Sequence, residues 1–387
     1  AVIALIAFFV AIGFGIVAPA IPVFAKSFGV SAFAASSVVS VFAFMRFASA
    51  PIAGYWVNKF GERSVLTIGL LIVSLSSFFA GLANDFNHLI VLRGAGGLGS
   101  TMFTVASFSL LLRIVSADQR GRAAAAFQGG FLIGGLAGPA VGGIVIAISL
   151  RAPFFVYSFT LLLAAGASAF FLNKHNKETL EKREKSKVGE SLKQFGQALK
   201  NRAYSAALSV NLATGFVSFG IRAAIIPIFV VEELRSSPSL IGFGFLATSI
   251  TQAAFLSLAG KRTDTHGRKP SMIFGTVILF ISVLVLVIFE TQIGFIVSMA
   301  IAGIGAAFMG SAPAAVVGDV TGGKKSGPVV AAFQMTGDFG SIVGPIVAGS
   351  LVDSLGFAWA FLTGAAISLV AIIFSMTMPE TKPKQNN

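Results

Sequence analysis

The 387-residue sequence contains no cysteine, only three histidines and few charged residues. The absence of cysteine excludes disulfides and thiolate sites, and it leaves the redox compartment open. The histidines, His88, His175 and His266, lie in separate loops, so no metal site or catalytic triad is indicated. Charged residues make up 11% of the chain, against about 25% in soluble globular proteins. This composition is therefore not that of a soluble globular protein.

The sequence also lacks the motifs of cofactor chemistry. The segment GDVTGGKK at 318–325 has the spacing of a phosphate-binding loop, but Lys325 stands where a serine or threonine would hold magnesium. An apolar run precedes the segment in place of a strand, which excludes ATP-driven transport by such a loop. We expect no cofactor, no bound metal and no enzymatic activity.

Long apolar runs dominate what is present, because 55% of the residues are hydrophobic and the mean hydropathy is +0.88. Crossing the hydrocarbon core takes about 20 apolar residues, and runs of that length without period-two alternation predict helices. The first run reads as a mature span and not as a signal peptide. Twelve runs qualify, at 1–25, 31–57, 64–84, 88–113, 122–148, 151–172, 204–231, 239–260, 270–289, 292–317, 328–352 and 357–378.

The net charge of +13 is distributed unevenly. Nearly all Lys and Arg fall in one set of connections, whereas the opposite set holds only Lys26, Arg151 and Arg235. By the positive-inside rule the basic side is cytoplasmic, and both termini lie on that side. No basic stripe alternates with aromatic residues, so we expect no nucleic-acid partner.

A polar interval divides the chain. Residues 173–203 mix basic residues with glutamates and predict a cytoplasmic connector, either a solvated linker or a segment lying on anionic headgroups. We predict an N-terminal six-helix bundle at 1–172, the connector at 173–203, a C-terminal six-helix bundle at 204–379 and a cytoplasmic tail at 380–387.

An internal repeat relates the two predicted bundles. A shift of 206 residues places Gly54 on Gly260 and Gly61 on Gly267, and it places AFQGGFLIGGLAGP (126–139) on AFQMTGDFGSIVGP (332–345). One constant offset over several spans predicts parallel repeats about an axis along the membrane normal.

Four motifs carry a resemblance to a known family. GYWVNKFGER (54–63) and GKRTDTHGRK (260–269) resemble the loop signature G-x-x-x-D-[RK]-x-G-[RK]-[RK], although the first copy has Asn58 at the aspartate. LIVLRGAGGLGS (89–100), GGLAGPAVGG (134–143) and IGFGIVAPAIP (12–22) resemble signatures of the fourth, fifth and first spans. Together they resemble the major facilitator superfamily, and its drug/proton antiporter branch, over essentially the whole chain.

The resemblance implies an all-α membrane protein with twelve transmembrane helices in two pseudo-symmetric six-helix bundles, the major facilitator fold. In the family the loop motif is a latch at the cytoplasmic mouth. Because Asn58 is uncharged, we expect Asp264 to carry the ionic part, against Arg120 or Arg122; the alternative is that these charges only set topology. The expected latch residues are Gly54, Asn58, Lys59, Gly61, Arg63, Gly260, Asp264, Gly267 and Arg268.

The glycine run of the fifth span predicts a helix that bends and packs tightly against a partner in the other half. We call the close contact between the two halves the seam. The residues expected there are Gly134, Gly138, Pro139, Gly142 and Gly143, with Gly344 and Pro345 as counterparts in the eleventh span.

Charges inside spans indicate function because they are costly there. Arg46 and Asp338 lie at similar depths in the second and eleventh spans. The resemblance implies that these two spans meet between the halves, so we predict a pair that a proton breaks, with a static packing pair as the alternative. Arg93 matches the family's fourth-span arginine, which implies a part in proton handling. Arg222 matches no motif, and substrate contact and snorkelling both remain open for it.

We hypothesise a proton-coupled antiporter for multidrug efflux, which exports hydrophobic or cationic small molecules by alternating access. An exporter or exchanger of an anionic or amphipathic metabolite is the alternative, because arginines outnumber acids within the spans. A non-transporting membrane sensor or lipid scramblase is a more distant alternative. The expected partners are a small-molecule substrate, protons and the lipid bilayer, for a monomer in a bacterial-type plasma membrane. The candidate cavity residues are Phe14, Arg93, Phe103, Phe216, Phe219, Arg222 and Phe308, although most phenylalanines in such a protein face lipid.

Overall fold

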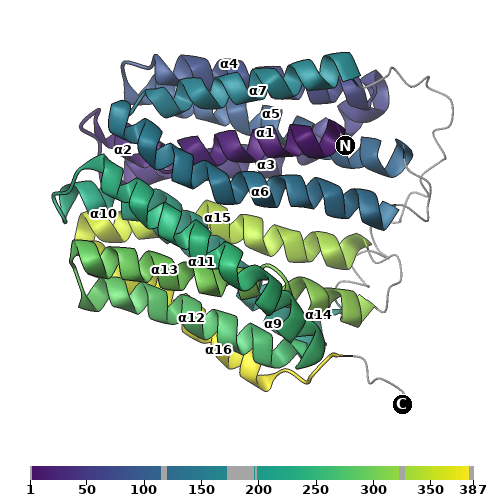
Figure 1. The fold of residues 1–387 in the computed structure, drawn as a ribbon, viewed down its shortest axis with the longest axis vertical. Helices are drawn as coiled ribbons and strands as arrows, with labels where there is room; N and C mark the ends of the chain where they lie inside the picture. The colour runs from purple at the N-terminus through teal and green to yellow at the C-terminus, as the bar shows by residue number, and fades with distance from the viewer. Residues whose placement is uncertain (1, 115–119, 172–195, 197, 322–326, 383–387) are drawn as a thin grey trace. The chain divides into compact units, whose positions relative to one another are not determined.

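The structure is a computed structural model that describes residues 2–114, 120–171, 196, 198–321 and 327–382 (Figure 1). Over these residues every regular element is a helix and none is a strand. Twelve helical stretches are long and apolar enough to cross a membrane. They coincide with the twelve predicted spans to within a few residues, so the predicted all-α membrane fold is confirmed.

Nine of the spans are single helices. In chain order they are α3 (Ala32–Phe60), α4 (Glu62–Gly81), α5 (Phe86–Ile114), α6 (Arg120–Ile148), α7 (Ala152–Phe171), α11 (Pro238–Thr265), α12 (Arg268–Ile288), α15 (Gly327–Leu355) and α16 (Phe357–Thr377).

The other three spans are interrupted. The first consists of α1 (Val2–Val17) and α2 (Ala20–Lys26), and the tenth of α13 (Gln292–Met309) and α14 (Ala312–Thr321). The seventh begins as α9 (Arg202–Gly215), continues as the π-helix η1 (Phe216–Ile225) and ends as α10 (Ile226–Glu232). Among the described elements only the seventh span contains π-helix. Because π-helix is rare and often marks functional positions, this span is a candidate for a functional role.

The chain forms two compact units. The first comprises Ala1–Glu181 together with Ile226–Phe243, and the second comprises Lys182–Ile225 together with Gly244–Asn387. The predicted connector at 173–203 lies outside the described residues except for 196 and 198–203.

The turns after the second and eighth spans follow the predicted repeat. Gly61 precedes α4 with φ +84°, and Gly267 precedes α12 with φ +114°. Only glycine adopts such angles readily, which explains why both copies of the loop motif place a glycine here.

Helix crossings repeat with the same spacing. In the first unit, a Cβ on Gly69 of α4 would lie 2.7 Å from the carbonyl oxygen of Gly99 on α5. In the second unit, a Cβ on Gly305 of α13 would lie 3.2 Å from the carbonyl oxygen of Gly275 on α12. Small residues let these backbones meet, so both bundles contain the same close crossing, 206 residues apart.

Candidate functional site

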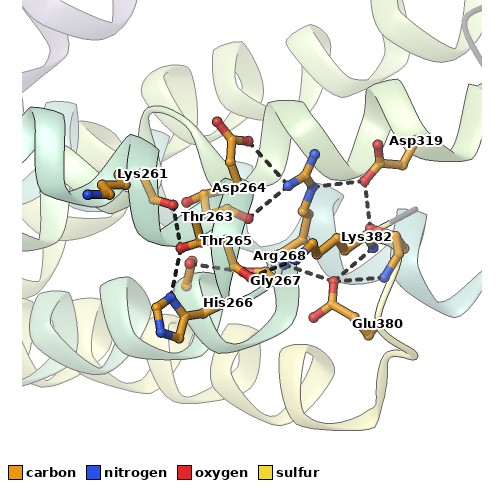
Figure 2. Close-up of polar contacts among 12 residues, drawn as sticks. Lys261, Thr263, Asp264, Thr265, His266, Gly267, Arg268, Asp319, Glu380 and Lys382 are labelled. Carbon is orange, nitrogen blue, oxygen red and sulfur yellow. Dashed lines mark hydrogen bonds and ion pairs between the residues drawn. The ribbon is translucent and has the colours of Figure 1, made fainter. Parts of the chain in front are cut away.

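A polar cluster lies where α11, α12, α14 and the segment after α16 meet (Figure 2). Its centre is Arg268, whose Nε donates to Asp319 Oδ2 at 3.0 Å and whose Nη1 donates to Asp264 Oδ1 at 3.2 Å. Nη1 also donates to the carbonyl oxygen of Thr263 at 2.8 Å. We call Asp264, Arg268, Asp319 and Glu380 the Arg268 cluster.

Glu380 caps the start of α12. Its carboxylate accepts the backbone N–H groups of Arg268 at 2.8 Å and Lys269 at 3.1 Å. Those groups have no partner within the helix, and Gly267 at the N-cap has no side chain to offer. A carboxylate there also complements the positive end of the helix dipole, so Glu380 supplies the cap that the local sequence lacks.

The pKa of Glu380 lies below its ordinary value. Partial burial alone would raise this pKa, but backbone N–H groups of Lys382, Arg268, Lys269 and Thr381 donate to the carboxylate and lower it. Glu380 is therefore ionised throughout the neutral range.

Two further contacts attach the tail. Thr381 Oγ1 donates to Asp319 at 3.1 Å, and Lys382 Nζ donates to the carbonyl oxygen of Thr265 at 2.6 Å. Asp319 thereby joins α14, α12 and the tail through one carboxylate.

The structure redistributes the roles expected within the second loop motif. Asp264 pairs with Arg268 of its own motif and its side chain is 75% exposed, whereas the side chain of Asp319 is only 17% exposed. The more shielded ion pair is therefore made by Asp319. The predicted partners Arg120 and Arg122 have side chains outside the described part of the chain.

The first loop motif makes fewer polar contacts. Arg63 Nη2 donates to the carbonyl oxygen of Ala169 near the end of α7, beside a groove of about 400 Å³ that both residues line. Lys59 lies near the rings of Tyr55 and Phe60. The side chain of Asn58 is exposed and forms no hydrogen bond with the residues that the structure describes. Gly54 and Gly260 face open space.

The glycines of the fifth span pack on the first span. A Cβ on Gly134, Gly138 or Gly142 would meet the backbone of α1 at 2.5–2.9 Å. Gly143 lies against Gly242 near the start of α11, in the second half of the sequence but in the same unit, and neither residue has room for a Cβ.

The eleventh span repeats this arrangement. Gly340 and Gly344 of α15 pack against the backbone of α9 and η1, and Pro345 follows within the helix. In the first unit a glycine face of α6 thus packs on α1, and in the second unit a glycine face of α15 packs on α9 and η1 of the seventh span.

The first unit also contains an ion pair between the first and seventh spans. Lys26 Nζ at the end of α2 lies 3.0 Å from Glu232 Oε1 at the end of α10. Both side chains are partly exposed, so the direct energy of this pair is small. Sequence analysis assigned Lys26 only to topology, and the partner could not be recognised without the fold.

Arg93 is buried among aromatic rings. Its side chain is on α5 and the residue is 2% exposed. The guanidinium carbon lies 4.4 Å from the ring centroid of Phe42, and Phe14 stacks on Phe42 at 5.9 Å. Tyr157 meets Phe14 edge-on at 6.3 Å. The face of the Phe42 ring stabilises the cation, although Nε of Arg93 has no hydrogen-bond partner among the described residues.

Arg46 and Asp338 occupy exposed positions near the middle of α3 and α15. Thr101 Oγ1 donates to the carbonyl oxygen of Arg46 at 2.8 Å, which fixes α3 on α5. Arg46 belongs to the first unit and Asp338 to the second, so their pairing stays a prediction.

The aromatic cavity candidates divide into two groups. Phe103, Phe216 and Phe308 are buried inside a unit, and Phe308 belongs to the hydrophobic core that surrounds Tyr204. Phe14 and Phe219 are half-buried. Arg222 is half-buried too, on η1 beside Phe219.

Sequence reasoning missed two members of the Arg268 cluster. Glu380 was assigned to a tail with no role, and Asp319 was not placed with the latch. The only signal was an acid just beyond the last span and another at the end of the tenth span, and their convergence on Arg268 needs the fold.

Comparison with known proteins agrees with this architecture. The family model described as Major Facilitator Superfamily matches residues 3–223 and 208–387. Multidrug resistance protein 2 of Bacillus subtilis is 27% identical over 386 residues, covering 96% of this chain and 92% of that protein. Quinolone resistance protein NorA of Staphylococcus aureus is 23% identical over 390 residues, covering 98% and 97%.

Solved structures share the fold at low identity. A bacterial homolog of the human lysosomal transporter Spinster, in an inward-facing and occupied conformation, gives a TM-score of 0.77 at 14% identity and covers 97% of this chain and 95% of its own. A D-xylose-proton symporter gives 0.74 at 18%, covering 98% and 97%. On the family match over both halves, this chain belongs to the Major Facilitator Superfamily and is a multi-pass transporter of the bacterial plasma membrane, not an enzyme.

Proposed function

We propose that this protein exports hydrophobic or cationic small molecules from the cytoplasm in exchange for protons, by alternating access. Relatives along nearly the whole chain are named for multidrug and quinolone resistance, which supports efflux. The excess of Lys and Arg in one set of connections supports a cytoplasmic position for both termini in this proposal. The Arg268 cluster then lies at the cytoplasmic end of the second unit, where it holds the α11–α12 turn, α14 and the tail together.

One observation carries the proton coupling. Asp338 lies near the middle of α15 at an exposed position, and a carboxylate facing hydrocarbon at that depth would be strongly unfavourable. Such a position is tolerated where it faces a polar cavity, and there the carboxylate can bind and release a proton. Asp338 is accordingly the coupling acid in this proposal, with Arg46 as the partner that holds it ionised.

The test uses purified protein in liposomes that contain a pH-sensitive dye. We expect cationic and neutral amphiphiles to release protons with the wild type, and we expect Asp338→Asn to abolish this release. Asp353→Asn is the matched control, because Asp353 is an exposed acid near the far end of the same helix. Proton release that persists in a folded Asp338→Asn protein would refute the coupling role. Substrate-dependent proton release would also exclude a sensor or a scramblase.

A second candidate function has its own observation. Arg46, Arg93 and Arg222 lie within spans, against Asp338 as the one acid well inside them. This excess of guanidinium groups favours a substrate with an anionic group, and a protein that moves only organic anions in the same assay would establish that alternative.

A further inference from the structure

The π-helix η1 presents two distinct faces. Burial along it alternates in pairs: Phe216 and Val217 are buried, Ser218 and Phe219 are half-buried, and the pattern repeats at 220–223. This four-residue period follows from the wider turn of a π-helix. One face of η1 therefore packs inside the unit, while the other carries Ser218, Phe219, Arg222 and Ala223, which we call the Arg222 face.

The packed face is clamped by neighbouring glycines. Gly220 lies against Gly344 of α15, where a Cβ would meet backbone atoms at 2.6–2.9 Å. Ile221 lies against Gly364 of α16, where a Cβ would meet its Cγ1 at 3.0 Å. Because α15 and α16 hold this side of η1, its rotation is fixed and the Arg222 face points away from both helices.

Arg222 brings an unsatisfied cation to this face. Its Nε and Nη1 are shielded from solvent and have no hydrogen-bond partner among the described residues. Pro227 has no N–H, so the carbonyl oxygen of Arg222, five residues earlier in the π pattern, receives no hydrogen bond from it. Two adjacent guanidinium donors of Arg222 are thus left without an acceptor among the described residues.

Snorkelling does not explain this arginine. A snorkelling side chain keeps its charged head in water or among headgroups, whereas two of the three guanidinium nitrogens of Arg222 are shielded. About ten residues, roughly 15 Å of helix, separate it from the end of the span at Glu232. Burying donors without partners is costly, so these two nitrogens are suited to an acceptor that is not among the described residues.

The residues beside Arg222 indicate which acceptor fits. Nε and Nη1 are adjacent donors of the guanidinium fork, and this fork matches the two oxygens of a carboxylate. Phe219, three residues before Arg222, belongs to the same half-buried face, and Ser218, about one turn before Arg222, adds a hydroxyl group. An aromatic ring beside a guanidinium and a hydroxyl suits a flat, apolar molecule that bears an acidic group.

We propose that the Arg222 face is a substrate subsite for the carboxylate of aromatic acids, so that the transported class includes acidic and zwitterionic amphiphiles. This inference rests on the proposed transport function. Arg222 binds the carboxylate through Nε and Nη1, and Phe219 packs against the apolar body. The π-helix serves to hold the arginine at this face while η1 stays locked to α15.

The test measures equilibrium binding at pH 7.5 to full-length protein in lipid nanodiscs. The probes are three aromatic carboxylic acids of different size, a quinolone among them, each compared with its ethyl ester. The variants are Arg222→Gln and Arg222→Lys, with Arg235→Gln as the control that removes an exposed positive charge outside the spans. Arg46→Gln tests the exposed arginine within the second span.

We expect the wild type to bind each acid about 10- to 100-fold more tightly than its ester, as a charge-assisted pair would give. Arg222→Gln abolishes this preference, Arg222→Lys retains part of it because the charge remains without the fork, and Arg235→Gln leaves it unchanged. A wild type without preference for the acids, or a preference lost in Arg46→Gln and kept in Arg222→Gln, would overturn the proposal. If Arg222→Gln does not fold, the acid–ester comparison on Arg222→Lys decides.

Failure of the subsite and failure of the proposed function have different signatures. If the protein prefers the acids but releases no protons, the subsite is supported and the proton coupling is refuted. A protein that releases protons with acids and esters alike, and binds them equally, keeps the coupling and loses the subsite.

Discussion

Arg268 contacts two carboxylates of very different exposure, which permits an internal comparison. The substitutions Asp319→Asn and Asp264→Asn each remove one negative charge that contacts Arg268. The side chain of Asp319 is 17% exposed and that of Asp264 is 75% exposed, while Arg268 itself is 13% exposed. The first substitution should therefore weaken the cluster far more than the second.

The magnitude follows from the contacts of each acid. Asp319 accepts a charge-assisted hydrogen bond from Arg268 and a neutral one from Thr381. Since an asparagine oxygen retains part of both bonds, we expect a cost of about 2 kcal/mol. Asp264 makes a solvent-screened pair, for which about 0.5 kcal/mol is expected. At 1.4 kcal/mol per factor of ten, local opening should rise about 30-fold for Asp319→Asn and about twofold for Asp264→Asn.

Hydrogen exchange at the start of α12 measures this opening directly, because the amides of Arg268 and Lys269 donate to Glu380 in the closed cluster. The exchange rates of both variants are compared with the wild type, with a peptide from α4 as the internal reference. If Asp264→Asn accelerates exchange as much as Asp319→Asn, the argument from burial is wrong.

Two further predictions concern the same turn. Gly267→Ala should destabilise the protein by about 1–3 kcal/mol, because a Cβ would be strained at φ +114° and would collide with the Glu380 carboxylate. Thermal unfolding measures this loss of stability. The control Gly260→Ala, at a position that faces open space, should show no loss of stability. The pKa of Glu380 is lowered from 4.5 in the folded protein. The ionised Glu380 carboxylate therefore stabilises the docked tail fully above pH 4.5, and this stabilisation disappears as the pH falls through the lowered pKa of the folded state. Hydrogen exchange at Arg268 should thus show constant protection from about pH 8 to about pH 5.5 and a loss only in stronger acid, and a loss near pH 6.5 would refute this assignment.

The sequence predicted much of the fold because lipid imposes simple rules. Apolar length located all twelve spans, and the 206-residue offset anticipated the matching turns at Gly61 and Gly267. Those positions are set by local constraints, hydropathy and a positive φ, which a single sequence displays.

The site was harder to predict because its members converge from distant segments. Arg268 was expected in a latch, but Glu380 lies 112 residues away and its role depends on a helix end without its own cap. The glycines of the fifth span were predicted to pack against the other half of the protein, and three of them, Gly134, Gly138 and Gly142, pack on α1. The sequence shows which face of a helix is small and not which helix covers it. The π-helix around Arg222 had no sequence signal, and its contacts with Gly344 of α15 and Gly364 of α16 are visible only in the fold.

Uphill transport tests the central claim most directly. Liposomes containing the purified protein are given a pH gradient, acidic inside, and a fluorescent cationic or zwitterionic amphiphile is added outside. Proton-coupled exchange predicts accumulation of the amphiphile inside, abolished by a protonophore and by Asp338→Asn but not by Asp353→Asn. Accumulation that is indifferent to the gradient, or equal in all three proteins, would contradict proton-driven export by this chain.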